Sequence, residues 1–213
     1  LILAIPLGGI LSKANYDLSK LNQFVQNTYI HRVIYFSLYQ AFISSLLSCL
    51  IAIPFALALN RNKNYKIVKF IISICGFSFV IPSILIVYAV IKLFGNNGFF
   101  NTYFNLYELT SINSIYGFKA ILIAHILLNA PFASRLFFQN LNNIPQKYYE
   151  ISSSLNLTYY GNIYKVELPI IGQNLFSVFA IIFSLCFLSF AIVMALGGGP
   201  NYSTIEVAIY QYA

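Results

Sequence analysis

The residues with the most informative types and spacing in this 213-residue chain lie in the stretch 139–169. Four apolar or aromatic side chains follow one another there at intervals of 4, 3 and 4 residues: Ile144, Tyr148, Ile151 and Leu155. Such intervals place side chains on one face of a helix. Pro145 suits the first turn of that helix, because its missing N–H group is not needed there. A short helix with one apolar stripe is typical of docking into a groove of another protein, so the chemistry indicated is binding rather than catalysis.

The second half of the same stretch predicts a sharp turn and a second helix. Asn156 is one of the few residue types that adopt the left-handed conformation found at helix ends. Thr158 suits the N-cap of the second helix, which we expect to continue to Leu168, and Pro169 is expected to begin a membrane span. The stretch is therefore predicted to form helix, turn and helix, with a stripe that faces something other than lipid.

Groups able to perform catalysis are scarce. The sequence contains no Walker-type glycine loop, no nucleophile elbow and no metal-ligand spacing. The three cysteines lie in apolar runs and are expected to be small buried hydrophobes: Cys49, Cys75 and Cys186. His125 lies within a predicted span, where it either packs through hydrogen bonds, the interpretation we favour, or contacts a substrate. We therefore expect a non-enzymatic chain with no catalytic residue, cofactor or metal ion.

The composition indicates a membrane protein. Hydrophobic types make up 59% of the chain and charged types only 8%, against about 25% in soluble domains. This balance excludes a disordered chain and argues against a soluble domain. It also argues against a nucleic-acid partner despite the formal net charge of +7, because basic residues spread through so apolar a chain are typical of membrane-flanking charge. We predict an all-α, polytopic helical protein embedded in a lipid bilayer.

Long runs without charge locate the spans, since a span needs about 20 apolar residues. Four spans are predicted: 33–59, 67–94, 117–138 and 170–196. Pro54 is expected to kink the first span near one end, and Pro82 lies near the middle of the second. Residues 1–11 are apolar but too short to span, and we interpret them as the end of a truncated first helix. The expected total is about five transmembrane helices.

Loop charges predict the orientation. Four basic residues lie close together between the first two predicted spans: Arg61, Lys63, Lys66 and Lys69. The connection 95–116 contains no basic residue. The positive-inside rule therefore places the first loop in the cytoplasm and the second outside, so that 139–169 is cytoplasmic and the tail from Gly197 is external. Three basic residues on the external side are exceptions: Lys13, Lys20 and Arg32.

The stretch 139–169 resembles the EAA signature of permease subunits of binding-protein-dependent ATP-binding-cassette (ABC) importers. That signature has Glu-Ala-Ala, a Gly six residues after the Glu, and then Ile-x-Leu-Pro. Glu150 stands at the Glu and Asn156 at the Gly. The final motif is matched by three residues: Val166, Leu168 and Pro169. Ile151 and Ser152 replace the two Ala, which is a departure, whereas Asn is the next-best residue for a positive φ.

The segment 187–211 looks like the corresponding segment of thiamine-importer permeases. It contains Ser-Phe-Ala, a Leu-Gly-Gly-Gly-Pro turn and Thr-Ile-Glu-Val-Ala-Ile-Tyr-Gln, which agree with that subfamily. Ferric-iron permeases share the general layout and are the nearest alternative. Four of its residues form either a gate hinge or, more commonly, a tight external turn: Gly197, Gly198, Gly199 and Pro200. Glu206 either attracts a cation or a basic residue of a binding protein, or is a solvated charge.

The resemblance implies a fold and a mechanism. Residues 1–213 would form a single type I permease module, truncated at both ends, with a second module in the same full-length polypeptide. Two cytoplasmic ATPase subunits would hydrolyse ATP, one bound to the coupling loop 139–169 and the other to the second module. An external binding protein would deliver the substrate. The implied location is the bacterial cytoplasmic (inner) membrane. The implied substrate is thiamine or its phosphates, with ferric iron or another small solute as the alternative.

Two hypotheses from other classes remain at this point: a membrane enzyme, and a channel or structural membrane protein. Small polar side chains within the predicted spans either line a substrate path or serve helix packing. They are Ser83, Asn129, Ser184 and Ser189. Thiamine is a cation with two aromatic rings, so a path with Tyr and Phe faces would suit it through cation–π contacts.

Overall fold

The computed structural model describes residues 27–104 and 116–212, and no β-strand occurs among these residues. The apolar segment 1–11 lies outside the described residues. The helices, in chain order, are α3 (Thr28–Arg61), α4 (Lys66–Phe77), α5 (Ser83–Phe94), α6 (Phe99–Phe104), α8 (Phe118–Asn142), α9 (Gln146–Ser154), α10 (Tyr159–Asn162), the π-helix η1 (Ile163–Glu167), α11 (Leu168–Phe187), α12 (Phe190–Leu196), the 3₁₀-helix η2 (Pro200–Tyr202) and α13 (Ile205–Tyr212).

Four helical stretches of the described part are long and apolar enough to cross a membrane. They are Thr28–Arg61, Ser83–Tyr103, Phe118–Asn142 and Tyr159–Phe187. The predicted all-α membrane class is thereby confirmed. Two of the predicted spans, 33–59 and 117–138, coincide with α3 and α8 to within a few residues.

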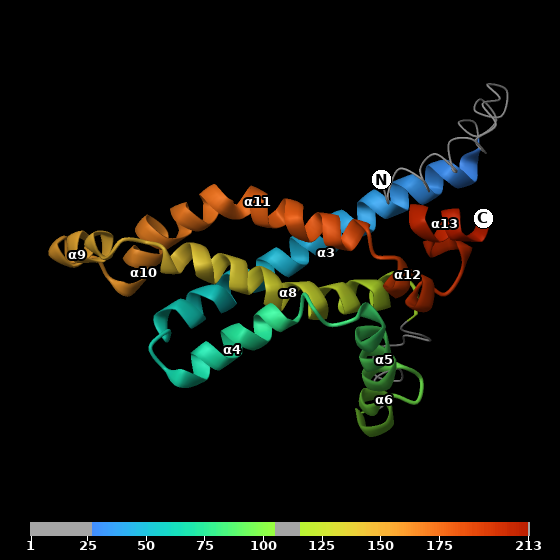
Figure 1. Cartoon of the computed structure of the whole chain (residues 1–213), viewed down its shortest axis with the longest axis horizontal. Coiled ribbons are helices and arrows are strands. Elements are labelled where there is room, and N and C mark those ends of the chain that lie inside the picture. Colours follow the sequence, from blue (N-terminus) through green and yellow to red (C-terminus); the bar gives the residue numbers. More distant parts are fainter. Residues whose placement is uncertain (1–26, 105–115, 213) are drawn as a thin grey trace, which may run out of the picture.

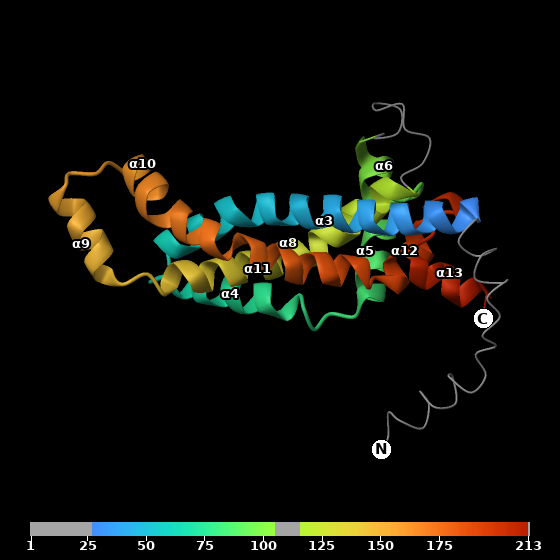
Figure 2. The same cartoon turned by 90° about the horizontal axis from the view of Figure 1, so that it is seen from above.

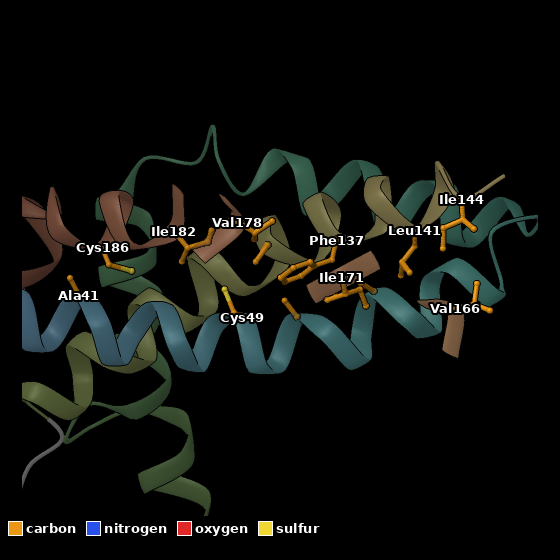
Figure 3. Close-up of a cluster of buried hydrophobic side chains, with 13 residues drawn as sticks. Ala41, Cys49, Phe137, Leu141, Ile144, Val166, Ile171, Val178, Ile182 and Cys186 are labelled. Carbon is orange, nitrogen blue, oxygen red and sulfur yellow. The ribbon is translucent and has the colours of Figure 1, made fainter. Parts of the chain in front are cut away.

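The main bundle consists of α3, α8 and α11, which run side by side along the long axis of the molecule (Figures 1 and 2). Their shared core contains Phe137 and Leu141 from α8 and Ile171 and Ile182 from α11, all of them buried (Figure 3). A second core joins α5, α8, α12 and α13 through Val90, Ile121, Leu196, Val207 and their neighbours. The bundle therefore has one core at each end of α8.

Helix α3 meets α8 through small side chains. The buried residues of its central part are almost all small: Ala41, Ser44, Ser45, Ser48, Cys49, Ala52 and Ala56. Small residues at intervals of three and four let two helix backbones approach closely within a membrane. The hydroxyl of Ser48 donates to the Ser44 carbonyl at 2.7 Å, so close packing leaves that hydroxyl satisfied. Pro54 lies inside α3, which continues as one helix from Thr28 to Arg61.

The predicted span 67–94 is wrong in one respect, because it is two helices. Helix α4 ends at Phe77, and α5 begins only at Ser83, directly after Pro82. Proline has no N–H to donate, and it disfavours helical angles in the residue before it, so this segment breaks where the sequence predicted continuity. Helix α4 then runs along α8, and α5 runs across it (Figure 1).

The predicted span 170–196 is also interrupted. Helix α11 ends at Phe187, and α12 begins at Phe190 after a non-helical Ser189 with φ of −100° and ψ of 77°. The Ser189 hydroxyl lies 2.9 Å from Nε2 of His125 on α8. No proline or glycine marks this break, so it accompanies a contact with another helix rather than a local sequence signal.

Candidate functional site

The predicted coupling loop lies at one end of the bundle. Helices α9 and α10 extend beyond the ends of α3 and α4 in both views (Figures 1 and 2). Pro145 occupies the N-cap of α9 with φ of −60° and ψ of 139°, one position before the first turn in which the sequence analysis placed it. The chain thus leaves α8, turns through Asn143 to Pro145, and presents a separate nine-residue helix at the tip.

The turn after α9 has the backbone that its sequence predicts. Asn156 has φ of 48° and is the one non-glycine residue with a positive φ in the described part of the chain. Its N–H donates to the Ser153 carbonyl at 3.0 Å, and the N–H of Leu157 donates to the Ser152 carbonyl at 3.0 Å. The hydroxyl of Thr158 accepts from the N–H of Gly161 at 3.3 Å, as an N-cap does. The turn is therefore held by hydrogen bonds on both sides.

The second helix of the loop does not stop at Pro169. It continues from α10 through the π-helix Ile163–Glu167 into α11, so one helical stretch joins the turn to the membrane span. A π-helix pairs each N–H with the carbonyl five residues earlier, as the N–H of Leu168 does with Ile163. Pro169 has no N–H to donate and lies where the π pattern changes to the α pattern, so the span accommodates it without a break.

The predicted apolar stripe is divided in the structure. Ile144 is only 8% exposed and belongs to the main core with Leu141 and Val166 (Figure 3). The other three are exposed, Tyr148 by 47%, Ile151 by 56% and Leu155 by 67%. We call these three side chains the outer face of α9. Ile144 therefore anchors the base of the loop instead of extending that face.

The remaining signature residues lie on both sides of the loop. Glu150 is exposed on α9, and Pro169 is exposed at the start of α11. Val166 is buried, and Leu168 packs against the main core. The signature thus combines an exposed helix with residues that anchor the following helix in the bundle.

Sequence reasoning missed a polar cluster beneath α9, formed by Asn60, Arg61, Tyr149, Tyr159 and Glu167. The Arg61 Nη2 lies 3.0 Å from Oε2 of Glu167, whose side chain is 3% exposed. The guanidinium also lies 3.8 Å from the centre of the Tyr159 ring. The hydroxyl of Tyr149 donates to Oε1 of Glu167 at 3.5 Å. A signal was available in the sequence, because Glu167 is an acid placed directly before the apolar run that begins at Leu168.

Burial and the neighbouring charges of this cluster change the pKa of Tyr149. Burial raises the pKa of the Tyr149 phenol above its ordinary value, and the neighbouring Glu167 carboxylate raises it further. Asn60 and Arg61 oppose these effects. The phenol therefore stays protonated and remains a donor to the Glu167 carboxylate.

A cavity of about 320 Å³ lies where the two interrupted spans meet α8. The break before α5 contributes Ser78, Phe79 and Ser83, and the break before α12 contributes Ser189. Helix α8 contributes His125, Asn129 and Phe132. The rings of Phe79 and Phe132 are stacked, with centroids 5.1 Å apart. Three residues proposed from the sequence for a polar path, Ser83, Asn129 and Ser189, therefore share one cavity with His125.

His125 is held on both sides of its ring. Its Nδ1 lies 3.1 Å from the Ser44 hydroxyl on α3, and its Nε2 lies 2.9 Å from the Ser189 hydroxyl. The side chain is 1% exposed. The amide of Asn129 donates to the sulfur of Cys186 at 3.2 Å. The favoured packing role of His125 and its position on the cavity wall are therefore compatible.

The other candidates for a path or gate lie away from this cavity. Ser184 is exposed on α11 and donates to its own helix, at the Ala180 carbonyl. Gly198 and Gly199 have φ of 70° and 145° in the connection after α12. Glu206 lies in the first turn of α13. The structure thus gives the glycine segment the backbone of a tight turn and leaves it outside the cavity.

Comparisons with known proteins give the relationship. No protein-family profile matches the chain. It is 38% identical over 186 residues to the thiamine transport system permease protein ThiP of Haemophilus influenzae, covering 86% of this chain and 34% of that protein. It is 34% identical over 204 residues to ThiP of Brucella abortus, covering 96% of this chain and 36% of that protein. A putative ferric transport system permease protein, FbpB 1 of H. influenzae, is 27% identical over 187 residues, which cover 87% of this chain and 29% of that protein.

A solved structure shares the fold. A chain of a bacterial ABC transporter involved in the import of the acidic polysaccharide alginate matches with a TM-score of 0.76 at 18% identity, covering 99% of this chain and 78% of that chain. The chain therefore shares the fold of this ABC transporter chain. The four candidate spans of its described part and its permease relatives make it a multi-pass protein of the inner membrane. It spans about a third of the length of the thiamine permeases it matches. The chain is thus a homologue of the thiamine transport permeases over nearly all of its own length.

Proposed function

We propose that this chain is part of the permease of an ATP-driven importer of thiamine or its phosphates, in which it forms one side of the translocation path. The observation that supports this most directly is the identity of 34–38% to thiamine permeases over 86–96% of the chain. Within that proposal, residues 1–213 belong to one permease module, and a second module completes the path. The chain itself performs no catalysis, since ATP hydrolysis belongs to partner subunits.

Helix α9 is the proposed contact with the ATPase. Its outer face presents Tyr148, Ile151 and Leu155 at the tip of a loop, beyond the helices of the bundle. The basic loop between α3 and α4 supports a cytoplasmic position for this end of the molecule. A short amphipathic helix of this kind fits a groove on another protein. One ATPase subunit would bind here, and a second copy would bind the other module.

The cavity between the interrupted helices is the proposed section of the substrate path. Irregular backbone at membrane depth is tolerated where it is buried in protein or lines a cavity, and broken helices often mark transport sites. Its stacked Phe79 and Phe132 rings suit an aromatic cation through stacking and cation–π contacts. Ser189 and Asn129 offer hydrogen bonds to such a ligand. An external binding protein would deliver thiamine to this path.

A ferric-iron importer is the second candidate. The observation that favours it is the 27% identity to the putative ferric permease FbpB 1 over 87% of the chain. The identity to thiamine permeases is higher over a similar part of the chain, and we therefore place thiamine first.

The test is uptake of labelled thiamine by cells that lack their own importer and receive the full-length gene with its ATPase and binding protein. Wild type should restore uptake, and Leu155→Asp should reduce it by at least about tenfold. An unpaired charge buried at an interface costs several kcal/mol, and about 1.4 kcal/mol is a factor of ten in affinity. Tyr65→Asp is the matched control, because Tyr65 is 66% exposed on the α3–α4 loop and lies outside α9.

Three results would contradict the proposal in different ways. Absence of thiamine uptake by the wild type would refute the substrate, and ferric iron would be measured next. Normal uptake by Leu155→Asp would refute the docking role of α9. An equal loss in Leu155→Asp and Tyr65→Asp, at normal membrane expression, would show that the effect does not depend on the outer face of α9.

A further inference from the structure

The polar cluster beneath α9 joins the end of α3 to α9 and to the helix that follows α9, and its Arg61 and Glu167 are 106 residues apart in the sequence. Asn60 and Arg61 end α3, Tyr149 belongs to α9, and Tyr159 and Glu167 belong to the helix that becomes α11. Arg61 contacts both ends of that last segment, through the 3.0 Å ion pair with Glu167 and through the Tyr159 ring at 3.8 Å. Tyr149 contributes the third side through its hydrogen bond to Glu167.

Stability alone is a poor explanation for this cluster. A buried ion pair gains little over well-packed apolar side chains, because two charges must leave water to form it. The cluster also leaves two polar atoms without a hydrogen-bond partner in the described structure, Nε of Arg61 and Oδ1 of Asn60. A partly satisfied network stabilises less than an apolar core would. What the ion pair does provide is a fixed register between the end of α3 and the start of α11.

The π-helix explains how Glu167 reaches Arg61. Glu167 is the last residue of that five-residue turn, and its side chain points inward while its neighbour Lys165 is exposed. A π-turn inside an α-helix shifts the face on which the following residues lie, and such turns are frequent at functional sites. The π-turn therefore points Glu167, the one acid in the described stretch Tyr159–Phe187, toward Arg61 at the end of α3.

Helices α11 and α3 are connected to α9 in different ways. Helix α11 follows α9 through the turn at Asn156 and a continuous helical stretch. Helix α3 has no covalent connection to α9. Besides the core that it shares with α8 and α11, it meets α9 and the helix that follows it through this cluster. Ser44 of α3 touches His125 at the cavity, about 25 Å from Arg61 at roughly 1.5 Å per residue along the helix. The cluster thus gives a displacement of α9 a direct route to the end of α3, and through α3 to the cavity wall.

We propose that Arg61 and Glu167 are positioning residues that transmit the movement of α9 to α3, and that the pair links ATP hydrolysis to substrate movement. The inference rests on the proposed function, because it assumes that an ATPase moves α9. The pair is not part of the outer face of α9, so it does not dock the ATPase. We therefore expect a transporter without the pair to bind its ATPase but to transport less thiamine for each ATP hydrolysed.

The experiment measures thiamine transported per ATP hydrolysed by the complete complex in proteoliposomes, with full-length permease, ATPase and binding protein. The variants are Glu167→Gln, which keeps the shape but removes the charge, Arg61→Gln, and the double reversal Arg61→Glu with Glu167→Arg. Each single variant should lower the transported-to-hydrolysed ratio by at least about fivefold, the lower end of coupling between sites. ATPase co-purification should be unchanged. The double reversal should recover most of the ratio, because it restores the ion pair.

Each alternative result decides the matter. Single variants with the wild-type ratio would refute the inference while leaving the proposed function intact. Loss of ATPase co-purification in the single variants, or a double reversal as defective as the single variants, would show that the cluster is merely structural. A wild-type complex that transports no thiamine would refute the proposed function, and this inference with it. Lys63→Gln is the matched control, since Lys63 lies at the same end, is exposed, and donates to Oδ1 of Asn142 at 3.2 Å.

Discussion

The turn at Asn156 allows a quantitative prediction about the coupling loop. Its φ of 48° lies in the left-handed region, which costs an ordinary L-residue roughly 1–2 kcal/mol, and Asn less because its short polar side chain tolerates it. Asn156→Gly should therefore leave the turn at least as stable as in the wild type. Asn156→Val should destabilise it by about 1–2 kcal/mol, since a β-branched side chain is poorly suited to a positive φ.

That difference is measurable as local opening. About 1–2 kcal/mol changes an opening equilibrium by roughly 5–30-fold. Hydrogen exchange of the full-length complex in lipid nanodiscs would report it at the amides of Asn156 and Leu157, which donate at 3.0 Å to Ser153 and Ser152. Both amides should exchange faster in Asn156→Val and at the wild-type rate, or slower, in Asn156→Gly.

A matched control separates the backbone effect from the effect of a valine. Ser154→Val places the same side chain two residues earlier, at an exposed position in the last turn of α9 with helical backbone. Its exchange at Asn156 and Leu157 should change by less than about threefold, since valine costs under ~0.7 kcal/mol in a helix. The reasoning fails if Asn156→Val exchanges like the wild type, or if Ser154→Val has the same effect.

Three further substitutions follow from the packing. Ala52→Leu adds bulk where α3 is fully buried in the core that it shares with α8. It should lower the free energy of unfolding by about 1–3 kcal/mol, measured as a lower midpoint of thermal unfolding in detergent. Leu50→Ala, at an exposed site of the same helix, should leave that midpoint unchanged. Thr158→Ala removes the N-cap oxygen and should cost about 1 kcal/mol, seen as faster exchange at Gly161. His125→Phe removes the ring nitrogens next to Ser44 and Ser189. It should raise the thiamine concentration that gives half-maximal uptake, while the ATPase still co-purifies. An unchanged half-maximal concentration would place His125 outside the path.

The parts of the fold that the sequence predicted are those with a strong local signal. Composition alone indicated an all-α membrane protein, and charge-free runs located α3 and α8 to within a few residues. The turn at Asn156 was predictable because few residue types adopt a positive φ. The position of Ile144 was not predictable, because helical spacing reports which side chains share a face but not where the helix begins. Here α9 begins at Gln146, and Ile144 falls in the core.

The two interrupted spans show why the candidate cavity could not be located beforehand. Pro82 was visible in the sequence, but prolines occur both in continuous membrane helices, as Pro54 does here, and at breaks. The break at Ser189 has no local signal, and it coincides with a hydrogen bond to a residue 64 positions away. Sequence reasoning could therefore name His125, Asn129 and Ser189 as polar residues within spans, while their meeting point depends on tertiary packing.

The cluster at Arg61 was missed for a related reason. In the sequence, Arg61 is one of four basic residues in a loop, and the positive-inside rule accounts for all of them equally. The structure distinguishes them, because Arg61 is the one of these four that forms an ion pair with a nearly buried carboxylate, that of Glu167. An acid beside an apolar run needs a partner, since an uncompensated buried charge is strongly unfavourable. Searching the basic loops for the partner of Glu167 would have narrowed the choice to a few residues, and only the fold identifies Arg61 among them.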